Sequence, residues 1–187
     1  MDEKFLKDYF KDFREQVNPD SGTLDKLLSL KDEMIKVHSK GLKTLIFGNG
    51  GSAAMASHFS VDLTKNAGVR CLNFNEADLI TCFSNDYGFE KWIEKTIEFY
   101  GDKGDLLILI SSSGKSLNMI NAANAAKKSK FSKVVTFTGF QENNPLKALG
   151  DINIWVNSRA YNFVENIHQV WLLSLVDLII GDKEYSA

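Results

Sequence analysis

The chain has 187 residues, of which 44% are hydrophobic and 25% charged, and its formal net charge is −2. These values are typical of one globular domain with a sizeable core. Because the sequence has no basic stripe, we expect no direct binding of nucleic acid, and no apolar run predicts a membrane span. Cys71 and Cys82 are the only cysteines, and the chain begins without a signal-like segment. We therefore expect reduced thiols and a cytoplasmic location.

Apolar residues at helical spacing predict helices within the first forty residues, with a break at 18–22. Beyond them, short apolar runs alternate with amphipathic stretches. We predict strands at 43–47, 70–74, 106–110, 133–138 and 152–156, and helices at 52–66, 76–85, 89–100, 116–129, 145–149 and 161–180. This alternation indicates an α/β fold, a three-layer α/β/α sandwich around a mostly parallel five-stranded sheet. We predict a single domain, with an N-terminal helical region at 1–40 and an α/β core at 41–181.

Two short loops carry the strongest functional signal. The glycine loop (residues 48–52, Gly-Asn-Gly-Gly-Ser) follows the apolar run 44–47, and the serine loop (residues 111–116, Ser-Ser-Ser-Gly-Lys-Ser) follows the apolar run 106–110. Such turns leave backbone N–H groups free beside a positive helix N-terminus, and serine hydroxyls add donors for phosphate oxygens. An ordinary helix cap would explain one serine but not four in six positions.

Ligands of open α/β sheets bind at the carboxyl ends of the strands. The two loops therefore predict one site for a phosphorylated small molecule, provided that their strands are neighbours. Neither loop fits a nucleotide motif. The glycine loop lacks the third glycine of a dinucleotide fingerprint, and the serine loop lacks the upstream glycine of a P-loop, so we expect no nucleotide cofactor.

The residues of these two loops and of the segments near them resemble the sugar isomerase (SIS) domain family, in particular its phosphoheptose isomerase branch. The resemblance covers nearly the whole chain, and its most specific segments are 48–54, 58–64, 84–89 and 111–116. It implies a three-layer α/β domain and a homotetramer with active sites where subunits meet. It also implies a set of substrate-binding residues: Asn49, Gly50, Gly51, Ser52, Asn85, Asp86, Ser111, Ser112, Ser113 and Ser116. Within this set, the serine loop binds the sugar phosphate.

The resemblance also implies zinc, with His58, Asp62 and Glu165 as the candidate ligands. His58 matches a zinc ligand of the isomerases, and Asp62 stands where their second ligand and catalytic base lies. The spacing of His58 and Asp62 independently suits a metal pair, because residues four apart share one helix face. Without a partner, however, His58 would more often be a packing histidine.

Four positions depart from the pattern of the isomerases, and one of them is Asn162, which replaces an aspartate near the sugar. Asp62 replaces a glutamate and is one methylene shorter, and Glu165 replaces a glutamine. Leu173 replaces a histidine that ligates zinc and transfers protons, and leucine can do neither. His168 lies five residues before Leu173, about 140° around the helix, so it does not simply take over that role.

The sequence thus predicts a phosphosugar isomerase that interconverts an aldose and a ketose through an enediolate. Its expected substrate is sedoheptulose 7-phosphate or a related sugar phosphate. The candidate catalytic residues are Asp62 or Glu165 as the base and His168 as an acid. Equally, Glu165 could be a surface carboxylate and His168 a packing residue. The alternative function is a non-catalytic SIS protein that binds a phosphosugar or another protein as a regulator, as replication-initiator-associating proteins do.

Overall fold

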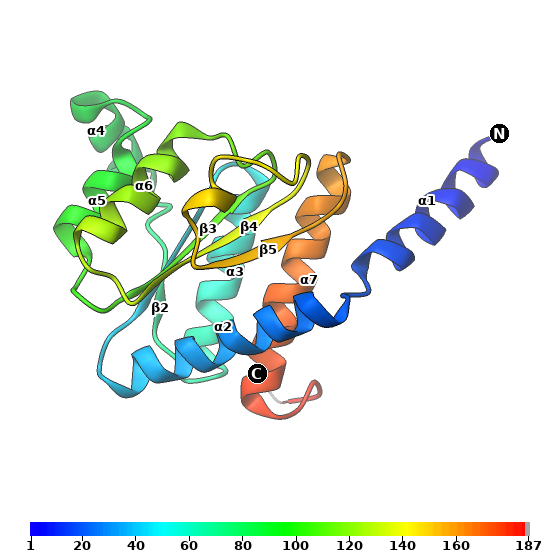
Figure 1. The fold of residues 1–187 in the computed structure, drawn as a ribbon, viewed down its shortest axis with the longest axis horizontal. Helices are drawn as coiled ribbons and strands as arrows, with labels where there is room; N and C mark the ends of the chain where they lie inside the picture. The colour runs from blue at the N-terminus through cyan, green and yellow to red at the C-terminus, as the bar shows by residue number, and fades with distance from the viewer. Residues whose placement is uncertain (186–187) are drawn as a thin grey trace.

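A five-stranded parallel sheet forms the centre of the fold (Figure 1). The structure is a computed structural model that describes residues 1–185. The five strands are β1 (Thr44–Gly48), β2 (Cys71–Leu72), β3 (Leu106–Ser111), β4 (Lys133–Thr138) and β5 (Ile152–Trp155). The helices are α1 (Asp2–Val17), α2 (Ser21–Ser39), α3 (Gly51–Lys65), α4 (Ala77–Tyr87), α5 (Trp92–Tyr100), α6 (Leu117–Lys128) and α7 (Tyr161–Ile180), with a short 3₁₀ helix, η1 (Lys147–Leu149).

The strand order is β2-β1-β3-β4-β5, and every pair is parallel. Thr44 pairs with Leu106 and Gly48 with Ile110, so β1 and β3 run side by side over their full common length. The order reverses between them, since β1 leads outward to β2 while β3 leads to β4 on the other side. The glycine loop and the serine loop therefore leave the sheet at its topological switch point, the usual place for a ligand.

Helices cover both faces of the sheet and create two separate cores. Alternate residues of each strand point to opposite faces. One core joins Ile46 and Ile108 to α2, α3 and α7, and the other joins Leu45 and Leu107 to α5 and α6. Strands buried on both faces explain the continuous apolar runs of the sequence. The predicted three-layer α/β/α sandwich is confirmed.

Two predicted elements differ from the structure. The strand expected at 70–74 is limited to Cys71–Leu72, and the side-chain amides of Asn73 and Asn75 hold the chain after it against α3. The helix expected at 145–149 is only η1, three residues long. There Asn144 Oδ1 accepts a hydrogen bond from the N–H of Lys147 at 2.9 Å, which favours a capped turn.

The last helix, α7, is long and apolar enough to span a membrane by composition alone, contrary to the expectation from the sequence. In the fold it is a core helix that packs beside α3 and carries buried side chains along its length, from Phe163 to Val176. By contrast, α1 has no buried residue and extends from the body of the molecule (Figure 1). Its apolar residues Phe5, Leu6 and Phe10 are exposed.

Candidate active site

The glycine and serine loops meet at the carboxyl end of the sheet. Asn49 of the glycine loop and Asn118 at the start of α6 exchange two amide hydrogen bonds, at 3.1 and 2.9 Å. Gly48 and Gly114 explain why glycine is needed here. A Cβ on Gly48 would clash with the backbone of Ser52, and one on Gly114, whose φ is +63°, with the side chain of Asn144. The two loops are therefore fixed to each other as one unit.

A small cavity of about 120 Å³, the serine cavity, opens between the two loops and the start of α7. It contains six of the ten predicted substrate-binding residues together with Glu165, a predicted catalytic residue. The residues that line it are Asn49, Ser52, Ile110, Ser111, Ser112, Ser113, Ser116, Tyr161 and Glu165. Gly50 and Gly51 lie next to it in the glycine loop and at the start of α3.

Hydroxyl groups form the floor of the serine cavity. Ser52, Ser111 and Ser112 are buried, and the hydroxyls of Ser111 and Ser116 lie 3.3 Å apart. Within the described chain, the Ser112 hydroxyl is buried without a hydrogen-bond partner. Ser116 is also the N-cap of α6, whose positive N-terminal end therefore lies at the cavity. Hydroxyl donors beside a helix N-terminus suit a phosphate group.

Glu165 is the one charged residue in the lining of the serine cavity. Its carboxylate lies against Gly51 at the start of α3, so closely that a Cβ there would clash with it. The N-terminus of a helix favours a negative charge, which gives this carboxylate a stable position without a partner cation. A carboxylate beside phosphate-binding hydroxyls is a suitable base for a bound sugar phosphate.

His58 and Asp62 lie one turn apart on α3, as predicted, with His58 Nε2 at 3.2 Å from Asp62 Oδ2. The other ring nitrogen of His58 lies 3.2 Å from the side-chain amide of Gln169 on α7. Neither His58 nor Asp62 lines the serine cavity. Within residues 1–185, no group of three histidine, cysteine or carboxylate side chains converges, so His58 and Asp62 have no third such donor beside them in one chain.

His168 is fully buried below the site and packs against the ring of Phe137. Its Nε2 donates a hydrogen bond to the carbonyl of Thr138 at 3.1 Å, the pairing that a neutral ring makes. Burial lowers the pKa of His168 from 6.5 to about 4, although the Thr138 carbonyl acts in the opposite direction. The ring is therefore neutral at physiological pH, and it does not line the serine cavity.

Asn85 and Asp86 lie at the end of α4, exposed and bonded to each other at 2.9 Å. Helix α4 stands near α5 and α6, on the opposite side of the sheet from α7 (Figure 1). The fold of one chain does not bring these two residues into the serine cavity.

Sequence reasoning missed three residues of the site: Tyr161, Asn118 and Gln169. Tyr161 lines the serine cavity, and its ring packs on Phe140 with 4.7 Å between centroids. Asn118 follows the serine loop by two residues. Its bond to the glycine loop depends on β1 and β3 being neighbours, which the sequence alone does not show. Contacts made by Tyr161 and Gln169 depend on where α7 lies, which no local pattern reveals.

The fold and the two joined loops define an SIS-domain protein. The family model of the SIS domain matches residues 8–139, and the chain belongs to this family.

Within the family, the chain is similar to phosphoheptose isomerases. That of Buchnera aphidicola subsp. Acyrthosiphon pisum is 32% identical over 187 aligned residues, which cover 97% of this chain and 91% of that protein. That of Fusobacterium nucleatum is 33% identical over 150 residues, covering 78% and 76%. The solved structure of phosphoheptose isomerase from Neisseria gonorrhoeae superposes with a TM-score of 0.87 at 24% identity, covering 97% of this chain and 100% of that one. At that identity the superposition establishes the fold.

Proposed function

We propose that this chain is a sugar-phosphate isomerase that interconverts an aldose and a ketose, with sedoheptulose 7-phosphate or a closely related sugar phosphate as its substrate. One observation carries the proposal: the carboxylate of Glu165 lies in the same small cavity as the serine hydroxyls. The likeness to proteins named phosphoheptose isomerase, across almost the full chain, supports the same reaction.

Isomerisation moves one proton between two adjacent carbons and exchanges a carbonyl with a hydroxyl. In the proposed mechanism the phosphate binds the hydroxyls of Ser111, Ser112 and Ser116, which leaves the sugar chain facing Glu165. The Glu165 carboxylate removes a proton from the carbon beside the carbonyl, which gives an enediolate, and returns it to the neighbouring carbon. Asn49 and Ser52 lie where their side chains can donate hydrogen bonds to the enediolate oxygens.

The other candidate residues receive different roles in this proposal. Asp62 is held by His58 on α3 outside the serine cavity, so Glu165 is preferred as the base. His168 acts as a packing residue that ties α7 to the end of β4, because a buried ring with a pKa of about 4 is a poor acid at neutral pH. The sugar hydroxyl that becomes the new carbonyl then loses its proton to solvent, and the former carbonyl oxygen takes one proton from solvent.

Zinc remains a proposal for His58 and Asp62 only. A histidine and a carboxylate suit zinc, but two donors do not complete a tetrahedral site, and Glu165 lies at the serine loop, in contact with Gly51. Bound zinc would polarise a sugar oxygen. No step above requires it.

We also propose a homotetramer, in which the exposed apolar side chains of α1 pack against other subunits. In such an assembly Asn85 and Asp86 could complete the site of a neighbouring subunit, since they lie outside the cavity of their own chain. Size-exclusion chromatography with light scattering tests the assembly.

The direct test is an assay of the purified protein with sedoheptulose 7-phosphate, with and without added zinc. We expect an aldose product in at least one condition. If neither gives product while the sugar phosphate still binds, the chain is a non-catalytic phosphosugar-binding protein. Leu173→His then separates a decayed enzyme, which gains activity, from a binding protein, which does not.

A further inference from the structure

The lining of the serine cavity contains no positively charged side chain to balance the charge of a phosphate. Its one charged side chain is the carboxylate of Glu165, and a phosphate monoester brings about −1.5 to −2 more at neutral pH. The N-terminus of α6 offers only about half a positive charge. A phosphate bound by the serines alone would therefore face a carboxylate with its own charge largely unbalanced.

A second cavity of about 230 Å³ adjoins the first and shares Ser113 with it. Its lining brings two cations together, Lys115 of the serine loop and Arg159 before α7, and it contains no acidic residue. Phe140 and Gln141 complete this lining. Ser113 thus stands between a cavity with a negative charge and a cavity with two positive charges.

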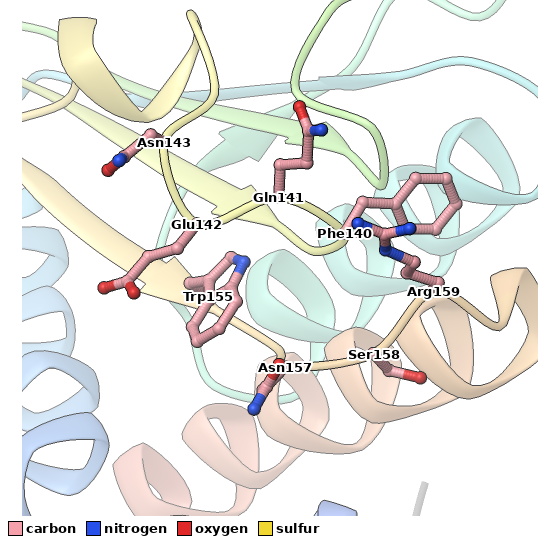
Figure 2. A pocket seen from close by; sticks show the side chains of 8 residues that line it. All are labelled: Phe140, Gln141, Glu142, Asn143, Trp155, Asn157, Ser158 and Arg159. Atoms are coloured by element: carbon pink, nitrogen blue, oxygen red, sulfur yellow. The ribbon is translucent and has the colours of Figure 1, made fainter.

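Both cations are free to bind a ligand. Lys115 and Arg159 are exposed, and within residues 1–185 neither forms an ion pair. Glu142 shares a larger neighbouring cavity of about 780 Å³ with Arg159. Glu142 lies 3.3 Å from Lys147, so its charge is already matched. Figure 2 shows Arg159 with Phe140 at one end of this larger cavity and Glu142 with Trp155 toward the other.

Backbone hydrogen bonds fix Arg159 beside the serine loop. The N–H of Gly139 donates to the carbonyl of Ser112 at 2.9 Å, and the N–H of Phe140 donates to the carbonyl of Ser158 at 2.8 Å. These two bonds link the loops that follow β3, β4 and β5 in sequence. Phe140 adopts a positive φ of 56°, which is unfavourable for a side chain of its size and is maintained by these contacts. The position of Arg159 is therefore built into the fold.

We propose that Lys115 and Arg159 form a cationic clamp that binds the outer oxygens of the substrate's phosphate at Ser113, while the serine hydroxyls bind the inner ones. This inference rests on the proposed sugar-phosphate substrate and adds two binding residues to it. It also gives the substrate a direction: the phosphate lies at Ser113 and the sugar chain extends away from the clamp, toward Glu165. The clamp selects ligands with a doubly charged phosphate monoester.

Calorimetric binding of inorganic phosphate tests the clamp without any requirement for activity. We expect Lys115→Gln and Arg159→Gln each to weaken binding about fivefold, and the double variant about twentyfold. Arg159→Lys retains the charge and should recover most of the affinity. Lys128→Gln, at the opposite end of α6, is the matched control and should bind like the unmodified protein. Added sodium chloride should weaken phosphate binding more in the unmodified protein than in the double variant.

Equal phosphate affinity in the unmodified protein and the double variant would overturn the clamp, as would a protein that binds no phosphate. Isomerase kinetics of the same variants distinguish a failure of the clamp from a failure of the proposed function. An active enzyme whose KM is unchanged in the double variant overturns the clamp alone. A chain without isomerase activity whose phosphate binding falls in the double variant supports the clamp and overturns the proposed reaction.

Discussion

Polar groups around Asp105, at the amino end of the sheet, are paired within the chain, whereas the serine cavity at the carboxyl end holds a hydroxyl without a partner among residues 1–185. At the amino end, the carboxylate of Asp105 is fully buried and fully paired. It accepts hydrogen bonds from the backbone N–H groups of Lys43 at 3.0 Å and Asp102 at 2.8 Å, and it lies 2.7 Å from the Lys43 ammonium. At the carboxyl end, the Ser112 hydroxyl is buried without a partner within the described chain.

This difference distinguishes residues that stabilise the fold from residues that can bind a ligand. A buried polar group without a partner costs free energy, and a ligand that supplies the partner recovers that cost. At the amino end the charges bind one another and connect the starts of β1 and β3. At the carboxyl end the free hydroxyls, the carboxylate of Glu165 and the cations of the clamp are available to a ligand. Substitutions at the two ends should therefore affect different measurements.

The largest effect should come from Glu165→Gln. If Glu165 is the base, kcat should fall about 10²- to 10⁴-fold, because the amide cannot accept the proton. KM should stay the same or fall, since the variant also removes a negative charge near the phosphate. Steady-state kinetics measure both parameters. Glu94→Gln on α5, on the other side of the sheet, is the control and should keep full activity.

Full activity in Glu165→Gln would transfer the role of base to another carboxylate. Asp62→Asn would then be the next variant to assay, because Asp62 is the second candidate.

At the opposite end of the sheet, Asp105→Asn should affect stability and not catalysis. The change removes the buried negative charge beside Lys43, whose side chain is only 11% exposed. We expect the free energy of unfolding to fall by about 2 to 3 kcal/mol, since the hydrogen bonds to a buried carboxylate are weakened or lost while Lys43 keeps its ion pair with Asp102 at 2.6 Å. Urea unfolding measures the loss, and kcat at a temperature where the variant is folded should not change. A kcat that falls with the stability would contradict the separation of the two ends.

The sequence predicted the central strands well and the elements at the periphery less well. The run 106–110 is continuously apolar and 133–138 is rich in β-branched and aromatic residues, and β3 and β4 match these runs within one residue. The short β2 was overestimated, and side-chain amides of the chain after it bond to α3. Local patterns also revealed the glycine and serine loops, since glycines and repeated serines mark them directly. The clamp was not predicted, because it requires the start of α7 to lie beside a loop more than forty residues earlier.

His168 gives a smaller, pH-dependent effect. Its pKa falls from 6.5 in the unfolded chain to about 4 in the fold, so between these values the unfolded chain binds a proton that the native one does not. This contribution to stability is fully present above pH 6.5 and is lost as the pH falls toward 4. The loss is about 1.4 kcal/mol per pH unit, or about 3 kcal/mol in total. Urea unfolding between pH 4 and 7 should show a steeper pH dependence for the unmodified protein than for His168→Gln, and equal slopes would refute the assignment.

The smallest effect, and the finest test of the carboxyl end, is expected for Gly51→Ala. The added Cβ would clash with the Glu165 carboxylate, which is the flexible end of its side chain and can move aside. We expect stability to change by no more than about 0.5 kcal/mol, because alanine is well tolerated at a helix start. Isomerase activity should nevertheless fall about tenfold, since a base displaced from the substrate transfers protons less efficiently. Unchanged kcat would mean that the contact between Glu165 and α3 has no part in placing the base.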